Sequence, residues 1–135
     1  MTHGTGGATE DLNARYRVVG EPPMRRAEIR VIGSDYGATS YTTKEQADHL
    51  AGLLGLESGM LLLDIGSGAG WPGIYLAHST GCRVVLTDLP LDGLRAAARR
   101  VEEEGVQGRV VATTGDALAL RDGMFDAATS SDVFC

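Results

Sequence analysis

The sequence predicts an α/β fold in which helices alternate with the strands of a doubly wound, mainly parallel sheet. Four short apolar segments have the length and composition of buried strands, and the stretches between the first three carry the apolar spacing of helices. The first of these segments also runs directly into a glycine-rich turn and a helix. Because strands joined through helices pair in parallel by right-handed crossovers, we expect the strand order 3-2-1-4.

The glycine-rich turn is central to this prediction and lies within residues 60–77, MLLLDIGSGAGWPGIYLA. Residues 60–65 form a short apolar run with one acid, Asp64, which is typical of a buried parallel strand. Glycines then alternate with small residues, so the backbone can adopt positive φ and let a ligand lie against its N–H groups. Pro72 suits the first turn of a helix, and the apolar residues after it supply a buried face. The order strand, glycine turn, helix predicts a nucleotide-type site.

Two classes of ligand use such a site. Gly68, Gly70 and Gly73 fit the dinucleotide pattern G-x-G-x-x-G, and Asp88 follows about 20 residues later, where a ribose-binding acid is expected. In the dinucleotide pattern, however, the first glycine follows the strand closely, whereas here Gly66 already ends the strand. An NAD(P)-dependent oxidoreductase therefore stays as the alternative from the same fold.

The stretch from Asp64 to Gly70, D-I-G-S-G-A-G, resembles motif I of the class I S-adenosylmethionine-dependent methyltransferases, an acid followed by x-G-x-G-x-G. Later segments resemble the family in order and spacing. Residues 83–88 and 109–113 resemble its second and third strands, the latter followed by Gly-Asp-Ala, and residues 125–131 resemble the fourth strand. The resemblance covers roughly residues 41–135.

This resemblance implies a Rossmann-like methyltransferase fold and S-adenosyl-L-methionine as the cofactor. It implies that Asp64 fixes the loop and the cofactor's ammonium, that Asp88 accepts from both ribose hydroxyls, and that an acid and a small residue border the adenine. The implied cofactor-binding residues are Asp64, Gly66, Ser67, Gly68, Gly70, Asp88, Leu89, Asp116, Ala117 and Ser130. The implied reaction needs no nucleophilic protein residue, so catalytic residues are not assigned.

Each of these residues also has a purely structural interpretation. Asp64 could be an ordinary acid at a strand end, Asp88 could cap the helix that begins at Pro90, and Asp116 could belong to a turn. Trp71 is expected to pack against the following helix rather than stack on a ligand. Tyr36 and Tyr41 could close over the cofactor or pack beside the helix at residues 43–54.

The remaining segments are predicted from local patterns. Residues 1–9 are expected to be a disordered tail, residues 10–19 a short amphipathic helix, and residues 24–37 to include a short extended piece. Thr42 and Glu45 fit a capping box for a helix over residues 43–54 that buries one face and ends at Gly55. A helix from Pro90 to Gly105 is expected to turn four residues inward: Leu91, Leu94, Ala98 and Val101.

The size of the chain bounds its organisation. At 135 residues it can form one core, and we divide it into an N-terminal tail and lid-like segment, residues 1–40, and a cofactor-binding domain, residues 41–135. The methyltransferase family has a seven-stranded sheet, so the sequence resembles its N-terminal half and is expected to be truncated or a fragment. A non-catalytic cofactor-binding fragment is therefore a third possibility. Such a chain is expected to show little methyl transfer alone and to self-associate through its exposed sheet edge.

Composition limits the partners. The net charge of −6 disfavours binding to a phosphate backbone, and no segment has the apolar length of a membrane span. The expected protein is therefore cytoplasmic, with no nucleic-acid or membrane partner, and methylates a small-molecule acceptor. Two cysteines and three scattered histidines give no disulfide framework and no metal spacing. Ser67 lacks the surroundings of a hydrolase nucleophile.

Overall fold

The computed structural model describes residues 5–113 and 120–131 of the chain. Within them, four strands form one sheet in the order β3-β2-β1-β4. The strands are β1 (Leu61–Ile65), β2 (Arg83–Asp88), β3 (Gly108–Ala112) and β4 (Ala127–Ser130). All three pairings are parallel, with Leu62 opposite both Val84 and Ala127. The predicted α/β class and the strand order 3-2-1-4 are confirmed.

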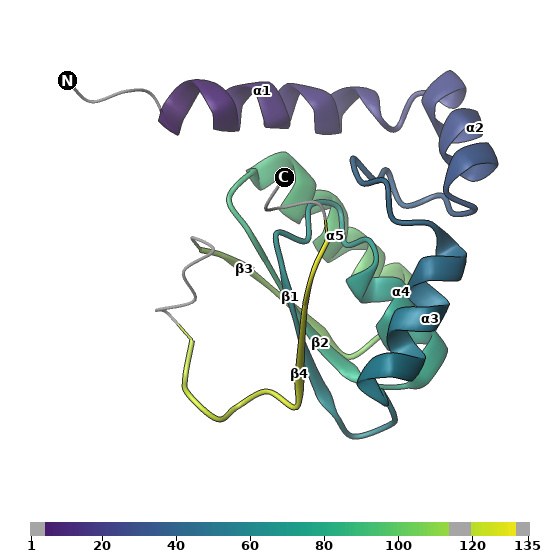
Figure 1. Cartoon of the computed structure of the whole chain (residues 1–135). Coiled ribbons are helices and arrows are strands. Elements are labelled where there is room, and N and C mark those ends of the chain that lie inside the picture. Colours follow the sequence, from purple (N-terminus) through teal and green to yellow (C-terminus); the bar gives the residue numbers. More distant parts are fainter. Residues whose placement is uncertain (1–4, 114–119, 132–135) are drawn as a thin grey trace.

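Three helices cover one face of this sheet: α3 (Lys44–Leu54), α4 (Gly73–Thr80) and α5 (Leu91–Glu104). Figure 1 shows these helices on one side of the sheet. Their buried residues pack on Leu62, Val84 and Leu86, which point to the same side of neighbouring strands. The alternate residues Leu61, Leu63 and Val85 form a smaller cluster on the other face, with partly buried side chains such as Phe125 against them. Both faces of these strands are apolar, as expected for a parallel sheet.

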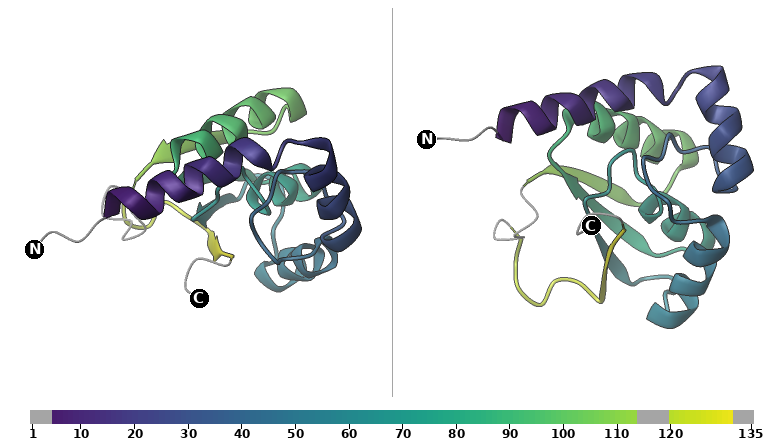
Figure 2. Two further views of the ribbon diagram at one scale, coloured as in Figure 1. Left: turned by 90° about the horizontal axis from the view of Figure 1, so that it is seen from above. Right: turned by 45° about the horizontal axis from the view of Figure 1, so that its top comes forward.

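The N-terminal part of the chain forms two further helices, α1 (Thr5–Val18) and α2 (Pro22–Val31). In Figure 1, α1 runs along the top of the molecule, beyond the carboxyl ends of the strands, and the views in Figure 2 place it across α5. The tail expected over residues 1–9 is wrong from Thr5 onward, where α1 has already begun. Residues 1–4 lie outside the described part.

The extended piece expected in residues 24–37 is also wrong over its first half, which is helical. Pro22 and Pro23 lie in the first turn of α2, where proline loses no hydrogen bond, so they are compatible with the start of this helix. Ile29 and Val31, whose alternation suggested a strand, are 53% and 68% exposed. Their spacing therefore reflects no buried sheet face.

α3 is capped one residue later than the pattern predicted. Thr43 is the N-cap and accepts from the Gln46 backbone N–H at 3.2 Å, while the Gln46 side chain accepts from the Thr43 N–H at 2.9 Å. The predicted capping box of Thr42 and Glu45 is therefore wrong by one residue. The predicted inward face, with Ala47 fully buried, is confirmed, as is the left-handed Gly55 after the last turn.

The inward face of α5 differs from the prediction by part of a turn. Leu94 is buried and Val101 packs on the core, as predicted, but Leu91 is 50% exposed and Ala98 is exposed. Gly93 and Ala97 are buried in their place. The rotation follows from two neighbours that a local pattern does not reveal: the ring of Tyr16 lies against Gly93, and the glycine loop lies close to Ala97. None of the helices that the structure describes is long and apolar enough to cross a membrane.

Candidate cofactor site

The loop after β1 is held against the end of β2 by backbone hydrogen bonds. The N–H groups of Gly66 and Ser67 both donate to the Thr87 carbonyl, at 2.7 and 3.0 Å, and the Thr87 hydroxyl donates back to the Asp64 carbonyl at 3.1 Å. Gly66, Gly68 and Gly70 have φ of 70°, 53° and 101°. L-residues with side chains rarely adopt such values, so the positive φ predicted for these glycines is confirmed.

Gly73, the first residue of α4, lets this helix pack closely against the sheet. A Cβ atom placed on it would lie 2.4 Å from Asp64 Oδ2 and 2.7 Å from Leu86 Cδ2. Only a hydrogen fits there. The first residue of α4 can therefore approach the sheet closely enough for its N–H to donate to Asp64 Oδ2 at 3.0 Å.

Asp64 lies beneath the loop and does not line the cavity described below. Its side chain is buried, and Oδ1 has no hydrogen-bond partner among the described residues. Burial raises the pKa of this carboxyl well above its usual range; the Gly73 N–H opposes that shift, and the nearby charge of Asp88 adds to it. This geometry gives Asp64 a role in fixing the loop, while its contact with a cofactor ammonium stays a prediction.

Asp88 ends β2 and closes the loop from the opposite side. Its Oδ2 accepts from the Gly68 N–H at 2.7 Å, and its Oδ1 accepts from the N–H of Leu89, which is 48% exposed, at 2.8 Å. Each oxygen keeps a second lone pair for a ligand. The N-cap of α5 is Pro90, with no side-chain hydrogen bond, so Asp88 does not have the capping role considered as its alternative.

A cavity of about 200 Å³ opens over the loop. The loop and the ends of β2 and β4 form its floor, α1 contributes two side chains, and the segment before α3 forms one wall. The lining residues are Leu12, Tyr16, Ala38, Thr39, Ser40, Gly66, Ser67, Gly68, Ala69, Trp71, Asp88, Pro90 and Ser131. Ser67 is 3% exposed, and its hydroxyl has no partner among the described residues, so it is available to a ligand.

The predicted residues are thus brought together in part. Gly66, Ser67, Gly68 and Asp88 line one cavity, and Gly70 lies in the same loop but turns toward Ile74 of α4. Ser131 lines the cavity, whereas its neighbour Ser130, at the end of β4, is exposed and does not. Asp116 and Ala117 lie outside the described residues.

The aromatic residues near the loop behave as packing residues. Trp71 is buried between Tyr36 and Tyr75, with ring centroids at 5.1 and 5.4 Å, and its Nε1 donates to the Thr42 carbonyl at 2.8 Å. The expected packing of Trp71 against α4 is confirmed, and because Trp71 also lines the cavity, its not stacking on a ligand stays a prediction. Tyr36 donates to Glu104 at 3.0 Å and Tyr41 is 85% exposed, and neither lines the cavity.

Sequence reasoning missed the contribution of α1. Tyr16 lies in the short amphipathic helix expected over residues 10–19, yet its ring lies over Gly68 and its hydroxyl is 3.1 Å from Thr39 Oγ1. Burial raises the pKa of this hydroxyl, the contact with Thr39 lowers it, and the charge of Asp88 raises it further. Gly93, an unexplained glycine inside a helix, was the one local signal that another element packs closely there.

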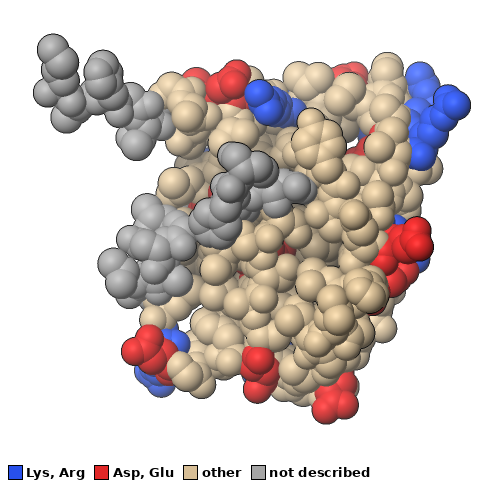
Figure 3. Space-filling view, viewed as in Figure 1, with Lys and Arg blue, Asp and Glu red and all other residues tan. Residues whose placement is uncertain are grey.

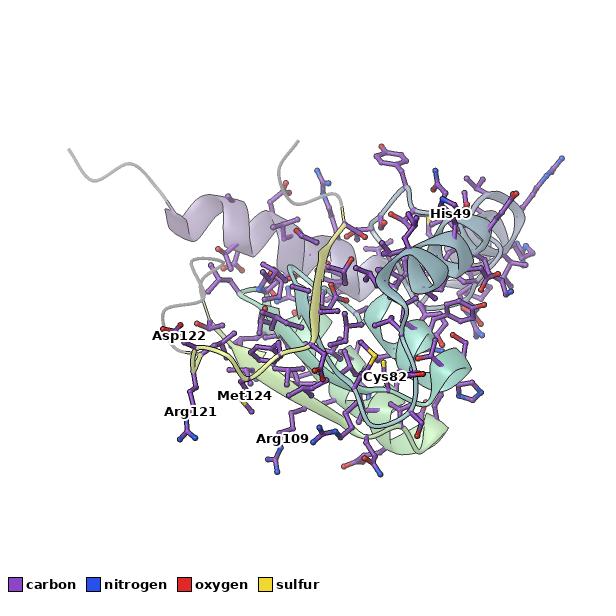
Figure 4. The ribbon with its side chains drawn as sticks, turned by 60° about the horizontal axis from the view of Figure 1, so that its bottom comes forward. His49, Cys82, Arg109, Arg121, Asp122 and Met124 are labelled. Carbon is purple, nitrogen blue, oxygen red and sulfur yellow. The ribbon has the colours of Figure 1, made fainter. Side chains whose placement is uncertain are left out.

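Metal chemistry finds no support in residues 5–113 and 120–131, where no three His, Cys, Asp or Glu side chains gather as a ligand set. Figure 4 shows His49 and Cys82 well separated, on α3 and just before β2. On the face shown in Figure 3, basic and acidic side chains alternate around the rim, and no continuous basic surface is visible there.

Comparisons with known proteins identify the family. A family model described as a methyltransferase domain matches residues 62–135, which is more than half of the chain. The chain belongs to this methyltransferase domain family. The matched region begins in β1 and contains the glycine loop and Asp88.

Individual relatives agree with this assignment. Methyltransferase GfsG from Streptomyces halstedii is 36% identical over 75 residues, which cover 54% of this chain and 27% of that protein. A SAM-dependent methyltransferase from Thiobacillus denitrificans, solved with S-adenosyl-L-homocysteine, is 35% identical with a TM-score of 0.54, over 65% of this chain and 36% of the other. An RNA methyltransferase from Salinibacter ruber, solved with the same compound, is 25% identical with a TM-score of 0.58, over 66% and 58%.

The chain therefore spans about a quarter of this curated relative and less than two thirds of either solved chain. Both likenesses support the Rossmann-like methyltransferase fold that the sequence predicted.

Proposed function

We propose that this chain binds S-adenosyl-L-methionine in the cavity over the glycine loop and supplies the cofactor site of a methyltransferase. The observation that carries the proposal is the position of Asp88. This residue accepts a hydrogen bond from the Gly68 N–H and lines the same cavity as the Ser67 hydroxyl, which has no partner among the described residues. A carboxylate at this strand end can accept from two ribose hydroxyls. Family membership and the relatives solved with S-adenosyl-L-homocysteine support the choice of ligand.

The start of α4 argues against a dinucleotide. A pyrophosphate binds to free N–H groups at a helix N-terminus, where the helix dipole favours negative charge. Here the N–H of Gly73, the first residue of α4, already donates to the buried carboxyl of Asp64. The N–H that a phosphate at this place would need is therefore already used, so the site suits a ligand without phosphates.

The remaining roles combine this geometry with the family resemblance. The cofactor supplies a methyl group already activated by a sulfonium, so the chain's own work is to orient it and to exclude water. We assign Asp88 to the ribose, and Gly66, Ser67 and Gly68, which line the cavity, to the amino-acid end. Asp64, Gly70 and Ser130 do not line the cavity and are assigned to the amino-acid end on the resemblance alone. On the resemblance alone, Asp116 and Ala117 are assigned to the adenine edge and Leu89 to the cofactor site.

For the acceptor we propose a small molecule. The net charge of −6 disfavours the phosphate contacts that RNA would need. Since one structural neighbour is an RNA methyltransferase, RNA methylation by the intact protein is the outcome that would overturn this part of the proposal.

Isothermal titration calorimetry tests the cofactor. S-adenosyl-L-methionine and S-adenosyl-L-homocysteine should bind, whereas NAD and NADP should give no heat. Asp88→Asn should weaken binding about 10- to 100-fold, because hydrogen bonds to a charged acceptor contribute roughly 1.5–3 kcal/mol. Asp122→Asn removes the same charge from an exposed residue that does not line the cavity, and should leave the affinity unchanged (Figure 4). Tight NAD binding without a response to the sulfur compounds would refute the proposal.

A further inference from the structure

A groove lies at the end of the sheet opposite the cofactor cavity. It crosses the amino ends of three strands, since the first residues of β1, β2 and β3 all line it, and its volume is about 410 Å³. Its lining combines apolar side chains with basic ones and, among the described residues, contains no acid. The apolar residues include Leu61, Val84, Val85 and Met124, and the basic residues are Arg83 and Arg109.

The arginines of this groove are exposed and largely unused within the chain. Arg109 makes no ion pair with any described residue, and Arg83 donates one hydrogen bond, to the Gly59 carbonyl at 3.2 Å. Figure 4 shows Arg121 pointing outward at the same end of the molecule, and it too pairs with no acid that the structure describes. Met124 is 51% exposed. The groove therefore offers apolar surface and positive charge together, in a chain whose net charge is −6.

The complementary charge lies on the last turn of α5. Glu102 and Glu103 are exposed there and make no ion pair within the described part of the chain, whereas Glu104 pairs with Arg100 at 3.2 Å. The last turn contains no basic residue, although the negative end of a helix favours cations. A cation from outside the chain would therefore stabilise this turn.

We propose that a second copy of this chain docks on the groove and forms a symmetric dimer. The two carboxylates of each copy, Glu102 and Glu103, face the arginines of the other copy's groove. Both surfaces belong to one end of the molecule, since Gln107, shortly after α5, lines the groove. A single two-fold axis can therefore make both sets of contacts.

The two kinds of contact have different effects. The apolar side chains of the groove supply burial, and the ion pairs fix the register of the two copies. The cofactor cavity lies at the carboxyl ends of the strands, so the dimer leaves both cavities uncovered. Dimerisation through the groove does not depend on the cofactor.

Sedimentation velocity of the full chain measures the dimer. Every protein compared carries Ala128→Lys, because the edge of β4 is a separate route to association. This parent chain should dimerise at micromolar concentration. Its dissociation constant should rise about tenfold between about 50 mM and about 500 mM salt, because ions screen exposed charges.

Charge reversal tests the pairing. Arg83→Glu with Arg109→Glu should raise the dissociation constant at least about tenfold, because like charges then face each other at two symmetric places. Glu102→Arg with Glu103→Arg should have the same effect on the dimer, while it suits the dipole of α5. The four substitutions together keep the net charge of the parent and should bring the constant back to within about threefold of the parent's.

Arg26→Glu with Arg99→Glu is the matched control. Both arginines are exposed, on α2 and α5, and neither lines the groove. This variant has the same net charge as the one with both groove arginines reversed, so it separates a local effect from general repulsion. Its dissociation constant should differ from the parent's by less than about twofold, since salt screens distant charges.

Each contrary outcome overturns the dimer. A parent chain that is monomeric at about 100 μM in low salt would do so. Equal dissociation constants for the groove variant and its control would show that the arginines are not part of an interface. If the acidic variant stayed dimeric, or if the four substitutions together did not restore association, the carboxylates of α5 would not be the groups that occupy the groove.

Discussion

At the scale of single residues, Gly73 lets the start of α4 pack directly against Asp64 of β1. Gly73→Ala should lower the free energy of unfolding by about 1–3 kcal/mol, because the new Cβ would lie 2.4 Å from Asp64 Oδ2 in a buried position. Urea denaturation measures the change.

Gly52→Ala gives the matched control for this substitution. Gly52 lies in α3, is exposed, and has no atom within 4 Å of a Cβ placed on it. Alanine there should stabilise the protein by about 0.5–1 kcal/mol, since it favours the helix. Equal effects at the two positions would show that the contact between Gly73 and Asp64 is not as close as described.

The pH dependence of stability should carry the signature of Asp64. Burial raises its pKa in the folded protein, so the folded state binds this proton more tightly than the unfolded chain does. Its contribution to stability is full below the unfolded pKa of about 3.9 and is lost as the pH rises through the folded pKa. The free energy of unfolding of the wild type, minus that of Asp64→Asn, should therefore fall with rising pH.

Asp35→Asn should give the opposite slope. A hydrogen bond from Arg25 lowers the pKa of Asp35 in the folded protein, so its contribution is lost as the pH falls through the folded pKa. The effect should be small, because both side chains are partly exposed. Denaturation curves at several pH values check both slopes, and a flat difference for Asp64→Asn would contradict the burial argument.

At the scale of elements, the start of α3 shows how a local pattern allows two answers. Both Thr42 with Glu45 and Thr43 with Gln46 fit the capping-box spacing. The structure uses the second pair, and the Lys44 N–H donates to the Ile32 carbonyl at 2.8 Å. That long-range bond, together with the one from Trp71 to the Thr42 carbonyl, fixes where the chain enters the helix.

Thr43→Ala should lower the free energy of unfolding by about 1 kcal/mol, because it removes the side chain that satisfies a free N–H of α3. Gln46→Ala should cost less, and Glu45→Ala should cost least. Thermal or urea denaturation distinguishes the two possible boxes. A larger loss for Glu45→Ala than for Gln46→Ala would favour the pairing that the sequence first suggested.

At the scale of the whole molecule, β4 is one of the two edges of the described sheet, the other being β3. β4 pairs with β1 alone among the described strands, and Ala128 in its middle is exposed. An unpaired edge offers free N–H and C=O groups to another chain. We predict that the 135-residue chain self-associates at micromolar concentration and that Ala128→Lys shifts it toward monomer.

Light scattering measures this association. Ala98→Lys introduces the same side chain at an exposed position on α5 and should not change the molecular mass. A wild-type chain that stays monomeric on concentration and heating would refute association through β4.

The sequence by itself determined the parts of this protein that depend on nearby residues. The strands, the positive φ of Gly66, Gly68 and Gly70, and the left-handed Gly55 follow from side-chain size and from apolar spacing within a few positions. The strand order also follows, because crossover handedness limits how strands and helices connect. These predictions are confirmed.

Only the tertiary structure decided which groups meet at the cavity. The buried side of α5 and the position of Tyr16 over Gly68 both depend on partners far along the chain. The bond between Asn13 and Asp92, for example, joins residues 79 positions apart. Local propensity carries no information on such contacts, because their free energy arises only when separate elements pack together.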